Sequence, residues 1–251
     1  MPRRWSKQRF DLVEVIAIAA FSTLFVWKVG TFSLPPEAAP LRKVYGPWHY
    51  TRGVEEWVIR DYFKDQRAGF FVDIGANHYK DENNTFYLEQ QLGWSGIAVD
   101  PLREFEADYG KYRPRTKFFA LFVSDVSDER AALYVAQSNT KVSSASREQT
   151  EDEAGQRASV TMVPTITLTD LLEGQGVSRV DLLSIDIELA EPKALAGFDV
   201  AKFKPRLVCI EAWLPVRQQI LDYFARHRYV VIGRYLRADP INLYFAPFPD
   251  N

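Results

Sequence analysis

Five acidic residues stand where the strands of this sequence are expected to end. Each closes or follows a short apolar run: Asp73, Asp100, Asp125, Asp186 and Glu211. A single such residue is explained equally well as the cap of a following helix, whose N-terminus attracts negative charge. Five in succession favour a ligand site, because ligands of open α/β sheets bind at the carboxyl ends of the strands.

The first of these strand ends opens the loop D-I-G-A-N-H, residues 73–78. A dinucleotide pyrophosphate favours a G-x-G-x-x-G loop without a nearby carboxylate, whereas this loop has one glycine and begins with Asp73. Gly75 would let the backbone approach a ligand closely. Asp100, 25 residues after Gly75, is placed to accept hydrogen bonds from ribose hydroxyls. A ribose without a pyrophosphate, joined to a cationic centre, describes S-adenosylmethionine, which we expect as the cofactor.

The elements that must position these residues alternate between strand and helix patterns. This alternation predicts an α/β fold with a doubly wound, mostly parallel, seven-stranded sheet. The chain closes on two consecutive strands, which predicts an antiparallel strand near one edge. The seven expected strands are 69–74, 96–100, 117–125, 179–186, 206–212, 229–235 and 241–247, and two more, 131–138 and 159–168, flank a polar stretch.

The N-terminal residues 1–32 differ from the rest. Four basic residues precede an apolar segment, Leu12 to Gly30, whose uncharged centre runs from Val15 to Trp27. That centre is shorter than the roughly 20 residues that span a bilayer, but the long ends can extend it. We expect a hydrophobic helix that anchors the protein in a membrane, with a signal peptide or an interfacial amphipathic helix as alternatives.

The side of the membrane is left open by the sequence. The basic cluster favours a cytoplasmic N-terminus and places the main domain on the far side, whereas the expected cofactor is made in the cytosol. The proline-rich residues 33–43 are expected to form a semi-extended linker, and residues 44–251 a globular domain.

Composition excludes several classes of protein and site. The 31 basic and 33 acidic residues nearly cancel, so nothing indicates a nucleic-acid partner. A single cysteine, Cys209, allows no internal disulfide, and three histidines without a cysteine cluster make a zinc site improbable.

Two long segments resemble a known family. The stretches "FVDIGANHYKDENNTFYLEQQLGWSGIAVDP" and "VPTITLTDLLEGQGVSRVDLLSIDIELAEPKALAGFD" are similar to the motifs of FkbM-type methyltransferases, and the resemblance extends from about Gly53 to Ala246. It implies a class I methyltransferase fold for residues 44–251. It also implies methyl transfer from S-adenosylmethionine, usually to a hydroxyl oxygen of a sugar or small metabolite.

The resemblance also implies roles for individual residues. Three positions would line the methionine part of the cofactor, one would hold its ribose and two would lie near its adenine: Asp73, Gly75 and Asn77, then Asp100, then Ser124 and Asp125. Three further positions would face the methyl group and the acceptor: Asp186, Glu188 and Glu191.

Several residues compete for the chemistry. Asp186 or Glu188 is the expected base or hydroxyl-orienting group, and His78 is a second candidate base unless it is a plain loop histidine. Glu191 could contact the acceptor or cap a helix, and Glu211 could contact the acceptor or close its strand. Asp186, Glu188 and Glu211 could together bind a divalent ion, although we expect a site without metal.

One departure from the family pattern raises an alternative function. Where the family has D-x-E-G-x-E, this chain has Leu189 in place of glycine. A backbone that needs a positive φ there would be strained by leucine, and otherwise leucine would narrow the acceptor pocket. The alternative is a membrane-tethered binding or scaffold protein that retains the fold without catalysis. A dinucleotide or nucleotide-sugar enzyme is disfavoured by the missing glycines.

Overall fold

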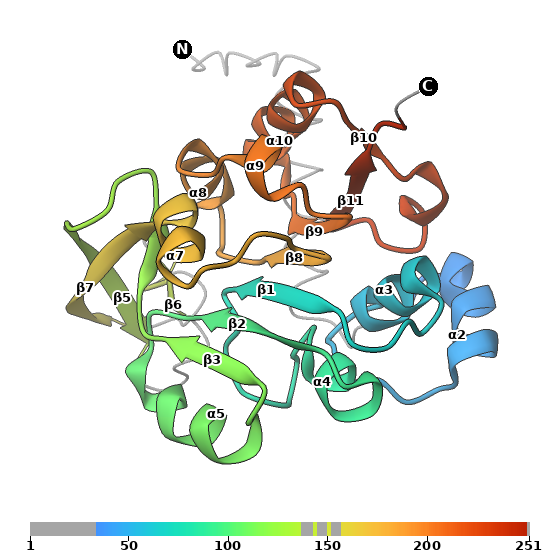
Figure 1. Ribbon diagram of the computed structural model, residues 1–251, viewed down its shortest axis with the longest axis horizontal. Coiled ribbons are helices and arrows are strands. Elements are labelled where there is room, and N and C mark those ends of the chain that lie inside the picture. The colour runs from blue at the N-terminus through green and yellow to red at the C-terminus, as the bar shows by residue number, and fades with distance from the viewer. Residues whose placement is uncertain (1–33, 137–142, 145–149, 152–156, 250–251) are drawn as a thin grey trace, which may run out of the picture. The chain divides into compact units, whose positions relative to one another are not determined.

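The computed structural model describes residues 34–136, 143–144, 150–151 and 157–249. Its main feature is a seven-stranded sheet of β1 (Phe70–Ile74), β2 (Ser95–Val99), β3 (Thr116–Phe119), β8 (Leu182–Ile185), β9 (Leu207–Glu211), β10 (Tyr229–Val231) and β11 (Asn242–Pro247). The strand order is β10-β11-β9-β8-β1-β2-β3 (Figure 1). β11 runs antiparallel to β9 and β10, and the other neighbours are parallel. The predicted sheet, with its antiparallel strand near one edge, is confirmed.

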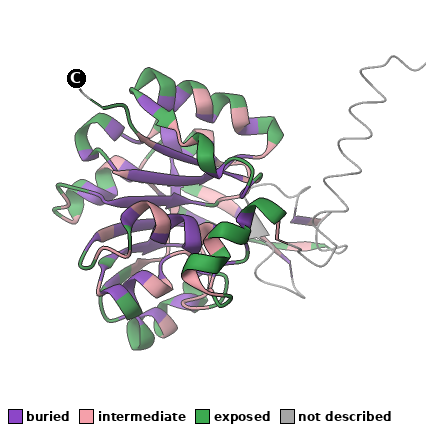
Figure 2. Ribbon diagram, turned by 90° about the vertical axis from the view of Figure 1, so that its right-hand side faces the viewer, coloured by how far each residue is buried: buried purple, intermediate pink, exposed green. Residues whose placement is uncertain are grey.

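Helices cover both faces of this sheet. On one face, Val72 of β1 belongs to an apolar cluster with Leu171, Leu195 and Phe224 from the C-terminal helices. On the other face, Tyr109 stacks on Phe118 of β3 with ring centroids 4.7 Å apart. Figure 2 shows the strands largely buried and the outer faces of the helices exposed. The helices are α3 (Glu55–Phe63), α4 (Phe86–Leu92), α5 (Glu106–Tyr112), α7 (Leu168–Gly174), α8 (Glu191–Ala196), α9 (Val200–Phe203) and α10 (Leu214–Arg226), with 3-10 turns η2 (Arg103–Phe105) and η3 (Gly233–Tyr235).

A second, four-stranded sheet corrects one predicted strand. It contains β4 (Phe122–Ser124), β5 (Arg130–Ala136), β6 (Ser143–Ser144) and β7 (Ala158–Thr167) in the order β4-β7-β5-β6. The sequence predicted one strand over 117–125, but the chain breaks between β3 and β4, where the Leu121 N–H donates to the Phe119 carbonyl. The end of this apolar run therefore pairs with β7 and lies outside the main sheet.

The N-terminal predictions have two outcomes. The expected hydrophobic helix within residues 1–32 lies outside the described residues, and within the described part no helix is long and apolar enough to cross a bilayer. The expected semi-extended backbone of residues 33–43 is wrong, because η1 (Pro36–Ala38) and α2 (Ala39–Tyr45) are helical. Pro36 and Pro40 stand in the first turns of these helices, where proline lacks only an N–H that has no partner in any case.

A buried polar network holds the loop that follows β1. Arg113, with no exposed surface, donates from Nε to the Glu89 carboxylate and from Nη1 to the Tyr79 carbonyl at 2.9 Å. It also donates to the Asn83 side chain, whose Nδ2 in turn donates to the Ala76 carbonyl at 2.9 Å. The loop is therefore held by hydrogen bonds from the Arg113 side chain, which is paired with Glu89, and from the Asn83 side-chain amide. Its conformation depends on both residues.

Replacing the arginine should therefore be costly. We expect Arg113→Met to lower the free energy of unfolding by about 3–5 kcal/mol, because it leaves the Glu89 carboxylate buried without its cation. Arg179→Met, which removes a mostly exposed partner of Asp181, should cost less than about 1 kcal/mol. Urea unfolding of the full-length variants measures both, and similar small losses would contradict a structural role for the network.

Candidate active site

Four carboxylates lie at the carboxyl edge of the central strands. Asp73, Asp100, Asp186 and Glu211 belong to or follow β1, β2, β8 and β9, which are consecutive parallel neighbours in the sheet. The predicted convergence of these strand ends is confirmed. Asp125 is the exception, because it follows β4 in the second sheet.

Gly75 joins two of these strand ends. Its φ is +80°, and a Cβ at this position would lie 1.8 Å from the carbonyl oxygen of Asp186. The loop after β1 thus touches the backbone after β8, which only glycine permits. The N–H groups of Gly75 and Ala76 also donate to the Val99 carbonyl at 2.9 and 3.1 Å, which ties the same loop to β2.

Asp100 has a fixed orientation at the end of β2. Its Oδ2 accepts from the Asn77 N–H at 3.0 Å and its Oδ1 from the Leu102 N–H at 2.9 Å. Burial, chiefly, raises the pKa of Asp100 to about 6, and these two N–H donors lower it. Each carboxylate oxygen can accept more than one hydrogen bond, so Asp100 retains acceptor capacity for hydroxyl groups.

Asp73 lies beneath the loop. It is 3% exposed and accepts from the Thr85 hydroxyl at 2.8 Å. Burial raises the pKa of Asp73 to about 6, and the hydroxyl of Thr85, the charge of Arg113 and the hydroxyl of Ser184 lower it. In this conformation the described hydrogen bond of Asp73 is to Thr85, at the far end of the loop after β1, and its predicted contact with the cofactor stays a prediction.

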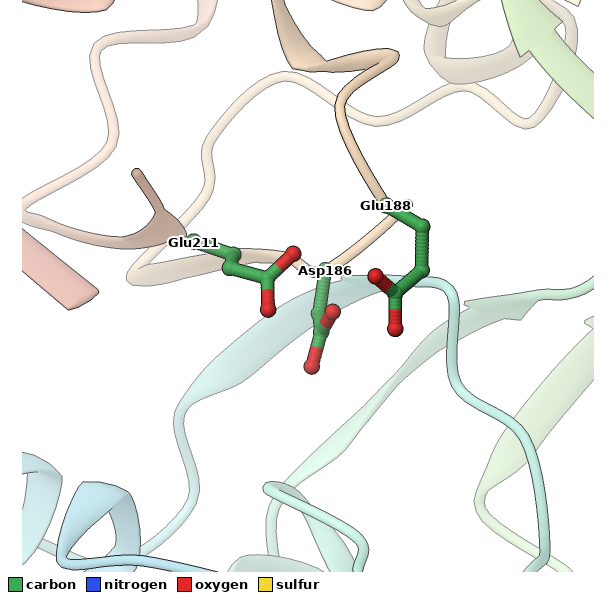
Figure 3. Close-up of side chains that lie close together, drawn as sticks. All are labelled: Asp186, Glu188 and Glu211. Carbon is green, nitrogen blue, oxygen red and sulfur yellow. The ribbon is translucent and has the colours of Figure 1, made fainter. Parts of the chain in front are cut away.

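Asp186, Glu188 and Glu211 form a compact acidic cluster. One carboxylate oxygen from each lies within 4.8 Å of the others, and Figure 3 shows the three side chains directed toward a common space. Burial, followed by repulsion from Glu188, raises the pKa of Asp186 well above its usual range. Burial and the Asp186 charge do the same to Glu211.

The three members differ in access to water. Asp186 is exposed to solvent even though protein atoms surround it closely, Glu188 is half-buried and Glu211 is 7% exposed. Because water reaches Asp186, we attribute its raised pKa to the neighbouring carboxylates as much as to burial. The cluster is therefore accessible from one side and enclosed on the other.

Comparison with known proteins now decides the family. The FkbM methyltransferase domain matches residues 73–231, which is more than half of the chain. The chain belongs to the FkbM methyltransferase family. Methyltransferases of this kind use S-adenosylmethionine, and the sheet order is that of the expected class I fold. Among curated proteins, none matches the chain significantly.

Solved methyltransferase structures resemble the chain only distantly. A TehB-like S-adenosylmethionine-dependent methyltransferase from Corynebacterium glutamicum is 10% identical, with a TM-score of 0.43 over 94% of this chain and 98% of its own. An S-adenosylmethionine-dependent O-methyltransferase from Thermotoga maritima is 10% identical, with a TM-score of 0.42 over 86% and 73%. A 1,6-didemethyltoxoflavin-N1-methyltransferase from Burkholderia thailandensis is 10% identical, with a TM-score of 0.39 over 98% and 94%. Similarity at this level identifies no substrate.

The carboxyl ends of the central strands in this FkbM methyltransferase suit its cofactor. A sulfonium cation is favoured beside the acidic cluster, and Asp100 can accept from ribose hydroxyls. Gly75 leaves no side chain between the β1 loop and the β8 end. The residues present therefore fit S-adenosylmethionine better than a dinucleotide, whose pyrophosphate would face the carboxylates.

The loop after β8 is strained. Glu188 and Leu189 have φ of 53° and 73°, a left-handed backbone that residues other than glycine seldom adopt. The strain foreseen for leucine at the family's glycine position is therefore present, and Leu189 also packs against the main apolar cluster.

Glu191, with no exposed surface, accepts from the Ile187 N–H at 3.1 Å, and burial raises its pKa to about 7. Its described hydrogen bonds are with the neighbouring backbone, and its role toward an acceptor stays a prediction.

The remaining predicted residues have partners outside the cluster. His78 Nδ1 accepts from the Asp81 N–H at 2.9 Å, so only its Nε2 is left for an acceptor. The Ser124 hydroxyl donates to Asp125 at 3.0 Å, and Asp125 forms an ion pair with Lys193 of α8 at 3.6 Å. No described hydrogen bond or ion pair links these three residues to the acidic cluster, and their assigned roles stay predictions.

Sequence reasoning missed one acidic residue near the site, Glu55. Glu55, at the start of α3, accepts from the Gly53 N–H and from Asn242, and burial and then Asp239 raise its pKa to about 7. The charge of Glu55 also raises the pKa of Asp186. In sequence, Glu55 is one of two glutamates in the first turn of an amphipathic helix, so only the fold could place it here.

The contact at Gly75 gives a direct test. We expect Gly75→Ala to destabilise the protein by about 3 kcal/mol or more, because the methyl group overlaps the Asp186 carbonyl and alanine disfavours φ +80°. Gly110→Ala, in α5 with open space around it, should be neutral or stabilising by up to about 1 kcal/mol. Thermal unfolding of the full chain compares the two. Equal tolerance of both substitutions would contradict the contact.

Proposed function

We propose that this protein transfers the methyl group of S-adenosylmethionine to a hydroxyl oxygen of a sugar, glycan or small metabolite. The observation that carries the proposal is the acidic cluster, Asp186, Glu188 and Glu211, at the edge that also presents Asp100. A hydroxyl group is weakly acidic and must lose its proton during transfer. Carboxylates with raised pKa are suited to take that proton.

The chain's own residues divide the work. When bound, S-adenosylmethionine supplies a methyl group on a positively charged sulfur that leaves as a neutral thioether. Asp100 would hold the ribose, and the acidic cluster would stabilise the positive charge before transfer. Asp186 or Glu188 would orient the acceptor hydroxyl toward the methyl group and take its proton. The products are a methyl ether and S-adenosylhomocysteine.

The exposed position of Asp186 favours it as the residue that meets the acceptor. An acceptor can reach Asp186 from solvent, whereas Glu211 is nearly enclosed and Glu191 is fully enclosed. The enclosed Glu191 acts through its charge, which raises the pKa of Asp186, and the charge of Asp186 raises the pKa of Glu211. His78 is the second candidate base, with Nε2 as its reacting atom.

A non-catalytic binding or scaffold role is the second candidate function. The observation in its favour is Leu189 at φ 73°, because leucine in place of the family's glycine strains the backbone beside the candidate catalytic carboxylates. Against it, Asp186, Glu188 and Glu211 still converge within 4.8 Å despite that strain. Cofactor binding separates the two functions.

Two substitutions divide binding from chemistry. Calorimetry of the full chain should show that it binds S-adenosylmethionine. Asp100→Ala should weaken this binding about tenfold to a hundredfold because a charged hydrogen-bond acceptor is lost, whereas the control Asp108→Ala on α5 should leave it unchanged.

Asp186→Asn should retain binding but lower methyl transfer to a panel of sugars by about 10²-fold or more, measured as released S-adenosylhomocysteine.

The pH dependence follows from the same carboxyl. A base must be unprotonated, and the pKa of Asp186 is raised, so transfer should fall on acidification well before an ordinary aspartate would protonate. If the wild-type chain does not bind S-adenosylmethionine, the proposed methyltransferase function is rejected and the non-catalytic binding or scaffold function is favoured.

We also propose that residues 12–30 anchor the protein in a membrane, on the strength of their apolar sequence alone. The full chain should sediment with membranes and resist extraction by carbonate, while Leu24→Glu should release it because a charge within the apolar centre is costly. Protease digestion of right-side-out vesicles then reports which side carries the domain. A wild-type chain that is extracted by carbonate would contradict the anchor.

A further inference from the structure

Two carboxylates of the acidic cluster, Asp186 and Glu211, lie close together without a described basic partner. Asp186, Glu188 and Glu211 bring carboxylate oxygens within 4.8 Å of one another, and like charges at such distances repel. Within the described part of the chain, neither Asp186 nor Glu211 forms an ion pair with a lysine or arginine. The buried Glu89 differs, because Arg113 neutralises it.

A second observation concerns Glu211 itself. This residue is 93% buried, as its exposed fraction of 7% shows, and its Oε2 is buried without a hydrogen-bond donor among the described residues. The Trp213 indole lowers the pKa of Glu211, yet no donor reaches Oε2 with hydrogen-bond geometry. Figure 3 shows the Glu211 carboxylate facing the space that it shares with Asp186. A buried oxygen without a partner is costly, so this carboxylate points to a missing positive partner.

We propose that Asp186, Glu188 and Glu211 bind one divalent cation of the hard class, such as Mg²⁺ or Mn²⁺. All three ligands are carboxylate oxygens, which such ions prefer, whereas soft ions favour sulfur and imidazole. Two oxygens bound to one such ion at about 2.1 Å lie at most about 4.2 Å apart, so oxygens that now lie within 4.8 Å of each other can share an ion after a small movement of their side chains. This assignment replaces the expectation of a site without metal.

The cation would leave room for a further ligand. Three carboxylates fill half of an octahedral shell, and the exposed side of Asp186 opens the rest to water or to an acceptor hydroxyl. A bound cation would lower the pKa of a coordinated hydroxyl group and so assist transfer of its proton to the carboxylate oxygen of Asp186 or Glu188 that does not bind the ion. This role rests on the proposed methyl transfer, whereas cation binding itself does not.

Titration with Mn²⁺ tests the site. The full chain, stripped with a chelator and kept free of S-adenosylmethionine, should bind one Mn²⁺ by electron paramagnetic resonance, and Mg²⁺ should displace it. Glu211→Gln and Glu188→Gln should each weaken binding at least about tenfold, the scale at which even partners outside the ligand shell act. Glu106→Gln, which removes one exposed carboxylate on α5, should bind Mn²⁺ like the wild type.

The outcomes separate this proposal from the proposed function. No Mn²⁺ binding, or equal binding by the wild type and both cluster variants, overturns the cation site even where calorimetry shows that S-adenosylmethionine binds. Mn²⁺ binding that depends on the cluster supports the site even where no methyl transfer is found. If Glu211→Gln does not fold, Glu188→Gln, on a half-buried loop position, gives the decision.

Discussion

The site depends on one backbone contact, the approach of Gly75 to the Asp186 carbonyl. A Cβ at Gly75 would lie 1.8 Å from that oxygen, so the loop after β1 and the loop after β8 can meet only at a glycine. The same loop is held from the other side by the Val99 carbonyl. Through this contact, the residues expected to hold the cofactor and those expected to act on the acceptor lie side by side.

Electrostatics then distinguish the two halves of the site. Asp100 accepts two N–H donors and Asp73 has the Thr85 hydroxyl, so both carboxylates are compensated within the protein. Burial raises the pKa of all four carboxyls, but the next largest influence is hydrogen bonding that lowers the pKa of Asp73 and Asp100, and repulsion from a neighbouring carboxylate that raises the pKa of Asp186 and Glu211. Charge that the protein leaves uncompensated is available for a ligand, whether a sulfonium, a proton from an acceptor or a cation.

The sequence predicted features that depend on local pattern. Apolar runs ending in acidic residues located β1, β2, β8 and β9, and alternation with helices predicted their parallel order. It could not show that the run 117–125 divides between two sheets, because both halves are apolar and the break is a matter of pairing partners. Residues 36–43 of the predicted linker were misjudged because prolines in a first helical turn look the same in sequence as prolines in a linker.

The candidate site, too, was predicted only in part from the sequence. The resemblance to the FkbM pattern identified Asp186, Glu188 and the unusual Leu189, but only backbone geometry showed that both Glu188 and Leu189 have positive φ. Glu55 escaped notice because its approach to the site requires α3 to pack beside β9 and β11, a contact between residues far apart in sequence.

A crystal structure of the full chain with S-adenosylhomocysteine is the most direct measurement of the central claim. The account predicts that the ribose hydroxyls lie within hydrogen-bond distance of Asp100 and that the sulfur faces the cluster of Asp186, Glu188 and Glu211. A ligand bound away from the carboxyl ends of β1, β2 and β8, or with its sulfur directed away from Asp186, would contradict it.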